Sequence, residues 1–392
     1  MLTQANSSLT LSTRAASIVQ SEIRGMSVEC DRVNGINLAQ GVCDTEVPSP
    51  VRAAARLAID QPGMNSYSRF DGLAELREAI AWKALKWNGI QADPETNVTA
   101  TAGSTAAFYS ACLALLNPGD EVILFEPYYG YHVNTLLSCE AVPAYVRLRS
   151  PRWTFNPDDL KAAWTPKTRA IMVNTPANPS GKVFSASELD WIACFAKEYD
   201  LFVFTDEIYE NFVYDGRRHI SPGSLPGMAE RTITISGFSK VFSITGWRIG
   251  YCISDARWTQ MIGYIHDLVY VCAPVPFQHA VALGIKELRS EFYRELTVDY
   301  RKKRDQLCKA LGEVGLRPSM PEGAYYVLAD ASGLPGASSK EKAMYLLSRT
   351  GIAAVPGDAF FHGPEADCFL RFCFAKTNEE LDKACQRLHA LL

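Results

Sequence analysis

Between residues 97 and 285, short runs rich in β-branched and aromatic residues alternate with longer stretches of helical periodicity, and this alternation constrains the fold most strongly. Strands that alternate with helices form a mostly parallel sheet, whose two faces the helices cover. The sequence therefore predicts an α/β fold with a mostly parallel sheet flanked by helices. The predicted strands are residues 98–101, 121–125, 170–173, 201–205 and 232–235.

Two of the intervening helices carry clear end signals. Asn117-Pro-Gly-Asp120 ends the helix that begins after Gly103. Ser185-Ala-Ser-Glu188 is typical of a capping box, which opens a helix through Ala196.

The pattern changes near residue 285, where a smaller α+β domain is predicted. We expect a large domain at 46–285, a small domain at 286–392, and an N-terminal arm at 1–45. The arm has too little apolar periodicity to fold alone, so we expect it to pack on the small domain. The elements predicted after residue 285 are a long charged helix at 287–311, strands at 323–328 and 369–374, a helix at 339–349, and a last helix from Asn378.

Composition excludes several classes of protein. With 392 residues, 47% hydrophobic residues and a net charge of −4, the chain is that of a globular protein, and it lacks the basic excess of a nucleic-acid binder. The first 25 residues lack a signal-peptide core, and no apolar stretch approaches the ~20 residues that span a bilayer. The eleven cysteines form no C-x-x-C pair. We therefore expect free thiols in a reducing, cytoplasmic compartment, with no membrane or nucleic-acid partner.

Ligands of open parallel sheets bind beyond the carboxyl ends of the strands, so the residues that follow each predicted strand are candidates for a site. Gly103 and Ser104 open a helix, where free N–H groups favour a phosphate. Tyr129 offers a face for stacking, and the amide of Asn178 can donate to an anionic oxygen.

The fourth and fifth strands add opposite charges. Asp206 follows five apolar residues, and a carboxylate there needs a cation or an N–H partner. Lys240 follows the fifth strand. Each residue alone also fits an ordinary structural role, but together they suit a phosphorylated, cationic, planar cofactor. Pyridoxal 5′-phosphate fits that description, since its aldehyde reacts with a lysine and its ring nitrogen pairs with a carboxylate.

The segment 237–250, GFSKVFSITGWRIG, resembles the lysine signature of the fold-type I pyridoxal-phosphate aminotransferases of class I/II. The resemblance is to the branch that includes kynurenine, aromatic and bacterial aspartate aminotransferases, and it covers nearly the whole chain. Further similar segments, in family order, are 38–41, 67–72, 103–104, 174–181, 206–209 and 370–372.

The resemblance implies roles around the cofactor ring. Lys240 would hold the cofactor covalently and, once released, act as the general base. Asp206 would pair with the ring nitrogen, Asn178 and Tyr209 would hydrogen-bond the phenolic oxygen, and Tyr129 would stack on the ring.

The resemblance also implies a phosphate site formed by Gly103, Ser104 and Arg248. Many relatives place a phosphate-binding serine three residues before the lysine, where this chain has Gly237, so Ser236 or Ser239 must substitute. Tyr67 would reach the phosphate of the neighbouring subunit, which implies a homodimer with active sites at the subunit interface.

For the substrate, the resemblance implies that Arg371 clamps the α-carboxylate with a bidentate fork, helped by Gly41 and Asn178. The segment 272–277, near which some relatives place partner residues, contains no arginine. We therefore expect an amino acid with a neutral or aromatic side chain rather than a strict dicarboxylate.

The resulting hypothesis is a ping-pong aminotransferase that moves the amino group of an L-amino acid to a 2-oxo acid. Two alternatives stay open. The same site could run a β-lyase or aminocyclopropane-carboxylate-synthase-like reaction, or the chain could be a non-catalytic effector-binding module, against which the complete lysine signature argues. The six histidines, His132 among them, are dispersed and are predicted to be structural, and no metal site is expected.

Overall fold

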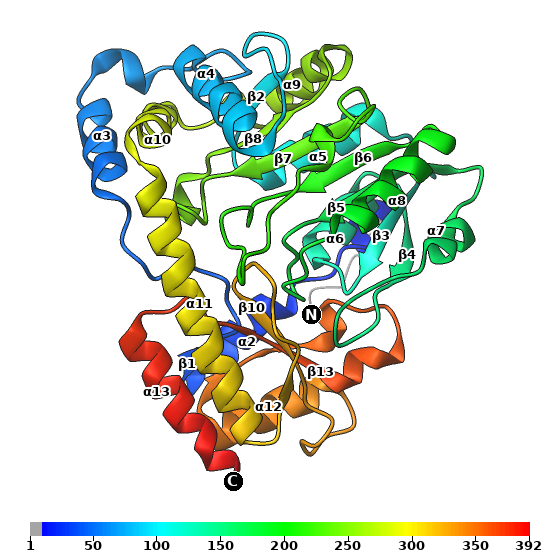
Figure 1. Ribbon diagram of the computed structural model, residues 1–392, viewed down its shortest axis with the longest axis vertical. Helices are drawn as coiled ribbons and strands as arrows, with labels where there is room; N and C mark the ends of the chain where they lie inside the picture. Colours follow the sequence, from blue (N-terminus) through cyan, green and yellow to red (C-terminus); the bar gives the residue numbers. More distant parts are fainter. Residues whose placement is uncertain (1–9) are drawn as a thin grey trace, which may run out of the picture.

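The alternating segments form a seven-stranded sheet in the computed structural model, which describes residues 10–392 (Figure 1). The strand order is β2-β8-β7-β6-β5-β3-β4, and β8 alone runs antiparallel to its neighbours. The predicted α/β class is therefore confirmed. The strands are β2 (Val98–Thr101), β3 (Glu121–Glu126), β4 (Val142–Arg147), β5 (Thr168–Asn174), β6 (Phe202–Asp206), β7 (Thr232–Gly237) and β8 (Gly250–Ile253).

The described part of the chain contains thirteen α-helices, some beside this sheet and others beside a second, smaller one. They are α1 (Thr13–Ala16), α2 (Glu22–Arg32), α3 (Ser49–Ile59), α4 (Ala74–Lys83), α5 (Ser104–Leu115), α6 (Gly130–Ser138), α7 (Pro157–Ala163), α8 (Ala186–Glu198), α9 (Ala256–Tyr270), α10 (Val275–Glu287), α11 (Ser290–Glu313), α12 (Ser339–Thr350) and α13 (Asn378–Leu388).

The two faces of the sheet are buried by alternate residues of the same strands. On β5, Met172 belongs to the apolar cluster that includes residues of α5, whereas Ile171 and Val173 belong to the cluster that includes residues of α8. This period of two is what a strand covered on both faces requires. The predicted capping box at Ser185 is present, with its hydroxyl accepting from the Glu188 N–H, and it fixes the start of α8.

A four-stranded antiparallel sheet, in the order β12-β13-β10-β9, forms the second layer of the molecule. The helix α11 runs from beside the large sheet to beside this smaller one (Figure 1). The predicted helix 287–311 corresponds to α11, which begins three residues later, because Leu288 and Arg289 are extended between α10 and α11. The strands are β9 (Arg317–Pro318), β10 (Tyr326–Asp330), β12 (Val355–Pro356) and β13 (Phe369–Cys373).

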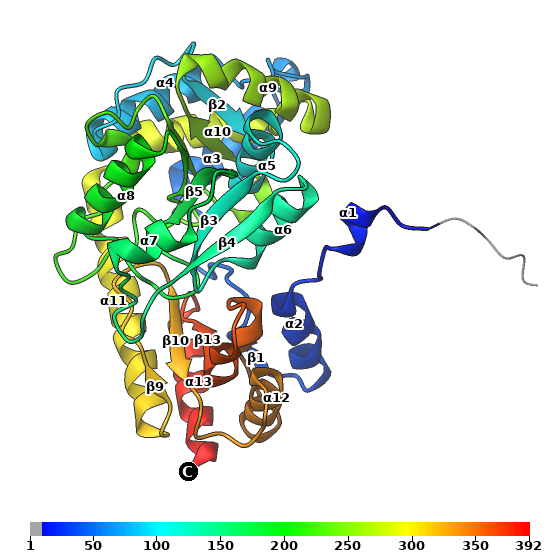
Figure 2. The ribbon, with the colours of Figure 1, turned by 90° about the vertical axis from the view of Figure 1, so that its right-hand side faces the viewer.

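The N-terminal segment lies against the second layer. β1 (Ile36–Asn37) pairs in parallel with β11 (Ile352–Ala353), and α2 packs on β11 and β12. Figure 2 shows α1 and α2 on the outside of the molecule. Residues 1–9 of the predicted arm lie outside the described residues, and the domain division itself stays a prediction.

Two further observations concern the chain as a whole. All eleven cysteines are free, and eight of them are buried. Within residues 10–392, no helix has both the length and the apolar character needed to cross a bilayer.

Candidate active site

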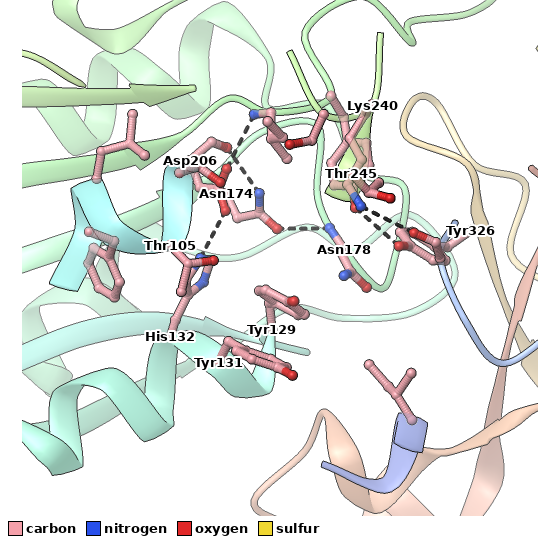
Figure 3. A pocket seen from close by; sticks show the side chains of 18 of the residues that line it. Thr105, Tyr129, Tyr131, His132, Asn174, Asn178, Asp206, Lys240, Thr245 and Tyr326 are labelled. Carbon is pink, nitrogen blue, oxygen red and sulfur yellow. Dashed lines mark hydrogen bonds and ion pairs between the residues drawn. The ribbon is translucent and has the colours of Figure 1, made fainter. Parts of the chain in front are cut away.

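A cavity of about 450 Å³ lies beyond the carboxyl ends of β5, β6 and β7, between the two sheets (Figure 3). It is lined from elements that are far apart in sequence: α2, the loop at residues 40–42, the start of α5, α6, and the two sheets. Most of the predicted site residues line it, namely Gly41, Ser104, Tyr129, Asn178, Asp206, Tyr209, Ser239, Lys240, Arg248 and Arg371.

Lys240 reaches the cavity from the turn after β7. Its Nζ donates to the Gly41 carbonyl oxygen at 3.1 Å and lies 5.8 Å from the centre of the Tyr325 ring. Gly41 has no room for a side chain, because a Cβ atom would come within 1.8 Å of the Tyr326 hydroxyl. Burial lowers the pKa of the Lys240 ammonium below that of an ordinary lysine. A lysine in this setting loses its proton more readily than one in water.

Asp206 ends β6 and turns its carboxylate to the cavity, with 8% of the residue exposed. Oδ1 accepts from the Ile208 N–H at 3.2 Å, and Oδ2 lies 3.0 Å from Nε2 of His132 (Figure 3). Glu207, the next residue, has separate partners, since its carboxylate accepts from Ser221 and is 2.6 Å from His219. The alternation of a strand thus separates two adjacent acids, and Asp206 is the one that faces the cavity.

Arg371 lies on β13 and is fully buried. Its guanidinium donates to Oδ1 of Asn178 at 2.9 Å and to the Ala39 carbonyl, and it stacks between the rings of Tyr326 and Phe360 at 4.3 and 4.9 Å. The oxygen partners are an amide and a carbonyl, neither of which carries a full charge. A buried guanidinium with only neutral partners favours an anion beside it.

Gly103, Ser104 and Arg248 form a cradle at the first turn of α5. Gly103 has φ +84°, and a Cβ atom there would lie 2.4 Å from the Arg248 guanidinium. Free N–H groups at a helix start, next to an arginine held against a glycine, suit a phosphate. The cavity therefore fits pyridoxal phosphate, with a phosphate cradle at one end, and with a lysine and a carboxylate lining the same space.

The structure distinguishes Ser236 from Ser239, the two serines that the sequence analysis gave as candidates for binding the phosphate. Ser239 lines the cavity. Ser236 is on β7 and donates to the Glu207 carbonyl at 3.3 Å and to the Glu210 carboxylate at 3.2 Å. Ser236 is not among the lining residues, so the geometry favours Ser239 as the phosphate partner.

The tyrosines have three different placements. Tyr129 precedes α6 and stacks on Tyr131 at 5.2 Å, and its ring edge meets His132. The Tyr209 hydroxyl is 3.1 Å from that of Tyr326. Tyr67 is 83% exposed and does not line the cavity of this chain.

The lining residues that the sequence analysis did not assign to the site include His132, Tyr326 and Arg24. His132 was predicted to be only structural, although it follows Tyr129 by three residues, a spacing that places both on one face of a helix. Tyr326 could have been found only from the pairing of β10 with β13, which sets Tyr326 opposite Cys373, diagonal to Arg371.

The fold and the cavity thus define an enzyme of the kind that uses pyridoxal phosphate. A comparison with protein families finds the model of the aminotransferases of class I and II over residues 33–388. The chain belongs to this family. It is a pyridoxal-phosphate-dependent aminotransferase, and its substrates are amino acids and 2-oxo acids.

Individual relatives agree with this assignment. The chain is 34% identical to aromatic-amino-acid aminotransferase 2 of Thermococcus litoralis over 98% of both chains. It is 33% identical to the kynurenine–oxoglutarate transaminase of Dictyostelium discoideum over 91% of both. The structure of N-succinyldiaminopimelate aminotransferase from Mycobacterium tuberculosis superimposes with a TM-score of 0.94, at 35% identity, over 98% of this chain and 100% of that one. These names favour amino-group transfer over the lyase and effector-module alternatives.

Proposed function

We propose that the 450 Å³ cavity is the active site of a ping-pong transamination, in which separate residues bind the cofactor, move the proton and bind the substrate. The observation that carries this proposal is that the Lys240 amine, the Asp206 carboxylate and the Arg371 guanidinium all line one cavity. Bound pyridoxal phosphate supplies an electron-withdrawing ring, which makes the Cα proton of an attached amino acid acidic.

Lys240 holds the cofactor and moves the proton. Its amine must be neutral to react with an aldehyde or to accept a proton, and burial favours the neutral form. A free Lys240 amine would lie in the same cavity as the substrate, where it would take up the Cα proton and return it. The contact with the Gly41 carbonyl at 3.1 Å keeps the amine oriented.

Asp206 keeps the ring nitrogen protonated, since a carboxylate in a site of low polarity stabilises a facing cation. His132 is a positioning residue, because its contact with Oδ2 at 3.0 Å leaves the carboxylate one orientation. Asn178 and Tyr209 would bind the phenolic oxygen, and Tyr129 would stack on the ring.

Arg371 binds the α-carboxylate, with Gly41 and Asn178 beside it. Within residues 10–392, the oxygen partners of its buried guanidinium are the Asn178 amide and the Ala39 carbonyl, which are both neutral. A carboxylate supplies the missing negative charge through a bidentate pair. The site therefore selects amino and 2-oxo acids by their α-carboxylate, whatever the side chain of the substrate.

The donor is an amino acid with a neutral or aromatic side chain. Tyr129, Tyr131, Ile23 and Val42 give the cavity an aromatic and aliphatic wall that suits such a side chain.

The enzyme acts as a homodimer in a reducing, cytoplasmic compartment. Tyr67 is exposed here and is available to a second subunit. Helix α9 also exposes apolar side chains, including Leu268 at 82%, as an interface would require. The eleven free thiols support the reducing compartment.

A half-reaction experiment tests this function. The holoenzyme is mixed with each of the standard amino acids and with kynurenine, in the absence of a 2-oxo acid, while the visible absorption of the bound cofactor is recorded. We expect neutral or aromatic donors to bleach the band stoichiometrically, and a 2-oxo acid to restore it. Continuous release of ammonia and a 2-oxo acid from the donor, with no acceptor present, would contradict the ping-pong assignment.

Gly103→Ala tests the phosphate cradle, and Gly119→Ala is its matched control. Both glycines have nearly the same φ, +84° and +85°, but only Gly103 has Arg248 against it, and nothing lies within 4 Å of the Cβ position at Gly119. We expect Gly103→Ala to weaken pyridoxal-phosphate binding by about 10- to 100-fold, because charged hydrogen bonds of this kind contribute ~1.5–3 kcal/mol. Fluorescence titration of the cofactor-free protein measures this affinity. Equal losses in the two variants would refute the cradle.

A further inference from the structure

The Gly41 carbonyl oxygen, which accepts from the Lys240 amine, has a second donor that the proposed function does not use. The Tyr325 hydroxyl donates to this oxygen at 3.2 Å, and Nζ of Lys240 donates to it at 3.1 Å. A carbonyl oxygen has two lone pairs, so it accepts both bonds at once. Gly41 lies outside any helix or strand, and the bond from Tyr325 therefore helps to fix the position of its oxygen.

Tyr325 itself has a fixed position. It directly precedes β10 and is fully buried. Burial raises the pKa of its hydroxyl well above the ordinary value, so the hydroxyl stays protonated and remains a donor. Its ring contacts four other aromatic rings, with centre-to-centre distances of 5.0 Å to Tyr209, 5.5 Å to Phe212, 6.0 Å to Tyr300 and 4.8 Å to Tyr326.

The bond from Tyr325 affects the Lys240 amine in two ways. It keeps the carbonyl oxygen where the free amine donates to it, which limits the orientations of that amine. It also places a hydroxyl hydrogen against the oxygen, which weakens the attraction of the oxygen for a charged ammonium and favours the neutral amine. The same loop holds the lysine turn at two further points, because Cys43 Sγ lies 3.4 Å from the Lys240 carbonyl oxygen and the hydroxyls of Thr45 and Ser243 are 2.5 Å apart.

We propose that Tyr325 is a positioning residue for the proton transfer: its hydroxyl holds the Gly41 carbonyl oxygen, and this oxygen orients the free Lys240 amine toward the Cα proton. This inference rests on the proposed function, because Lys240 is the base of that reaction. Tyr325 is not among the residues that line the cavity, so it acts on the reaction through Gly41 rather than through the substrate.

Tyr325→Phe removes the hydroxyl alone, and Tyr214→Phe is its matched control. The Tyr214 hydroxyl is also buried and donates to a carbonyl oxygen at 2.5 Å, but this oxygen belongs to Ala324. Both variants therefore lose one buried hydroxyl-to-carbonyl bond. We expect Tyr325→Phe to slow single-turnover bleaching of the bound cofactor about 3- to 10-fold and to leave KM for the donor within about twofold. The isotope effect for a donor deuterated at Cα should increase, whereas Tyr214→Phe should keep the wild-type rate and isotope effect.

A second measurement uses the cofactor-free protein. The pH dependence with which an amine-reactive reagent labels Lys240, followed by peptide mass spectrometry, gives the pKa of this amine. We expect Tyr325→Phe to raise that pKa by about 0.5 to 1, because the freed oxygen attracts the ammonium more strongly, and we expect no change in Tyr214→Phe. The other charged and titratable groups that act on the amine are the same in both variants, namely Asp206, Arg248, Cys43 and Cys373.

The outcomes separate this inference from the proposed function. If the two variants slow bleaching equally, or if Tyr325→Phe changes neither the isotope effect nor the pKa of Lys240, the role of Tyr325 is wrong and the proposed function stands. If no donor bleaches the wild-type cofactor, or if Lys240→Ala keeps the wild-type rate, the proposed function itself fails.

Discussion

Lys240→Ala is expected to lower kcat by at least about 10⁴-fold, because the variant loses both the covalent attachment of the cofactor and the base that moves the Cα proton. The side chain reaches into open cavity space, so its removal leaves the core intact, and we expect an unchanged fold by circular dichroism. Cofactor binding persists in part, since the phosphate cradle and Asp206 are still present.

Lys309→Ala is the control for this variant. Lys309 is 77% exposed on α11, where it forms an ion pair with Glu313 at 3.8 Å, so its loss should leave kcat within error of wild type. The measurement is single-turnover bleaching of the bound cofactor with a donor amino acid. Wild-type turnover by Lys240→Ala would remove the lysine from the reaction and with it the proposed division of work.

Asp206→Asn is expected to lower kcat by about 10³-fold, because a unit charge facing another at about 4 Å contributes ~4 kcal/mol at the effective dielectric of a partly buried site. Asparagine keeps the size of the side chain and one contact to His132, so packing is preserved. The lost quantity is the negative charge that holds a proton on the ring nitrogen. Asp206→Glu keeps that charge and should recover part of the rate.

Glu207→Gln provides the contrast, because it changes the adjacent acid, whose partners are His219 and Ser221 rather than the cavity. We expect it to lower the free energy of unfolding by about 1–3 kcal/mol, since it weakens a buried hydrogen-bond network. Its kcat should fall far less than that of Asp206→Asn. Similar kcat losses in the two variants would mean that general destabilisation, rather than charge at the ring, explains the Asp206 effect.

The sequence predicted the parallel core of the fold because its strands are apolar runs bounded by helices with recognisable caps. All five predicted strands are present, and β2 matches its predicted bounds of 98–101. β4 and β8 were not predicted. β4 contains Pro143 and is an edge strand with mixed burial. β8 begins at Gly250, the last residue of the lysine signature, and it was not identified as a strand.

The site residues at strand ends were predictable for the same topological reason. Parallel strands bring their carboxyl ends to one edge, so Asp206 and Lys240 line one cavity although 34 positions separate them. Contacts that depend on tertiary packing were not predictable, and the position of Arg24 at the cavity follows from how α2 packs on β11 and β12. The choice between Ser236 and Ser239 likewise required knowing which face of β7 meets the cavity.

The central claim is that Lys240 holds the cofactor in the cavity that Asp206 lines. Reducing the holoenzyme with borohydride fixes the cofactor to the amine that carries it, and peptide mass spectrometry then locates the phosphopyridoxyl group. We predict that the group is found on Lys240 and that it is absent when a saturating donor amino acid has first converted the cofactor. A phosphopyridoxyl group on any other lysine, or none on the untreated holoenzyme, would contradict the account.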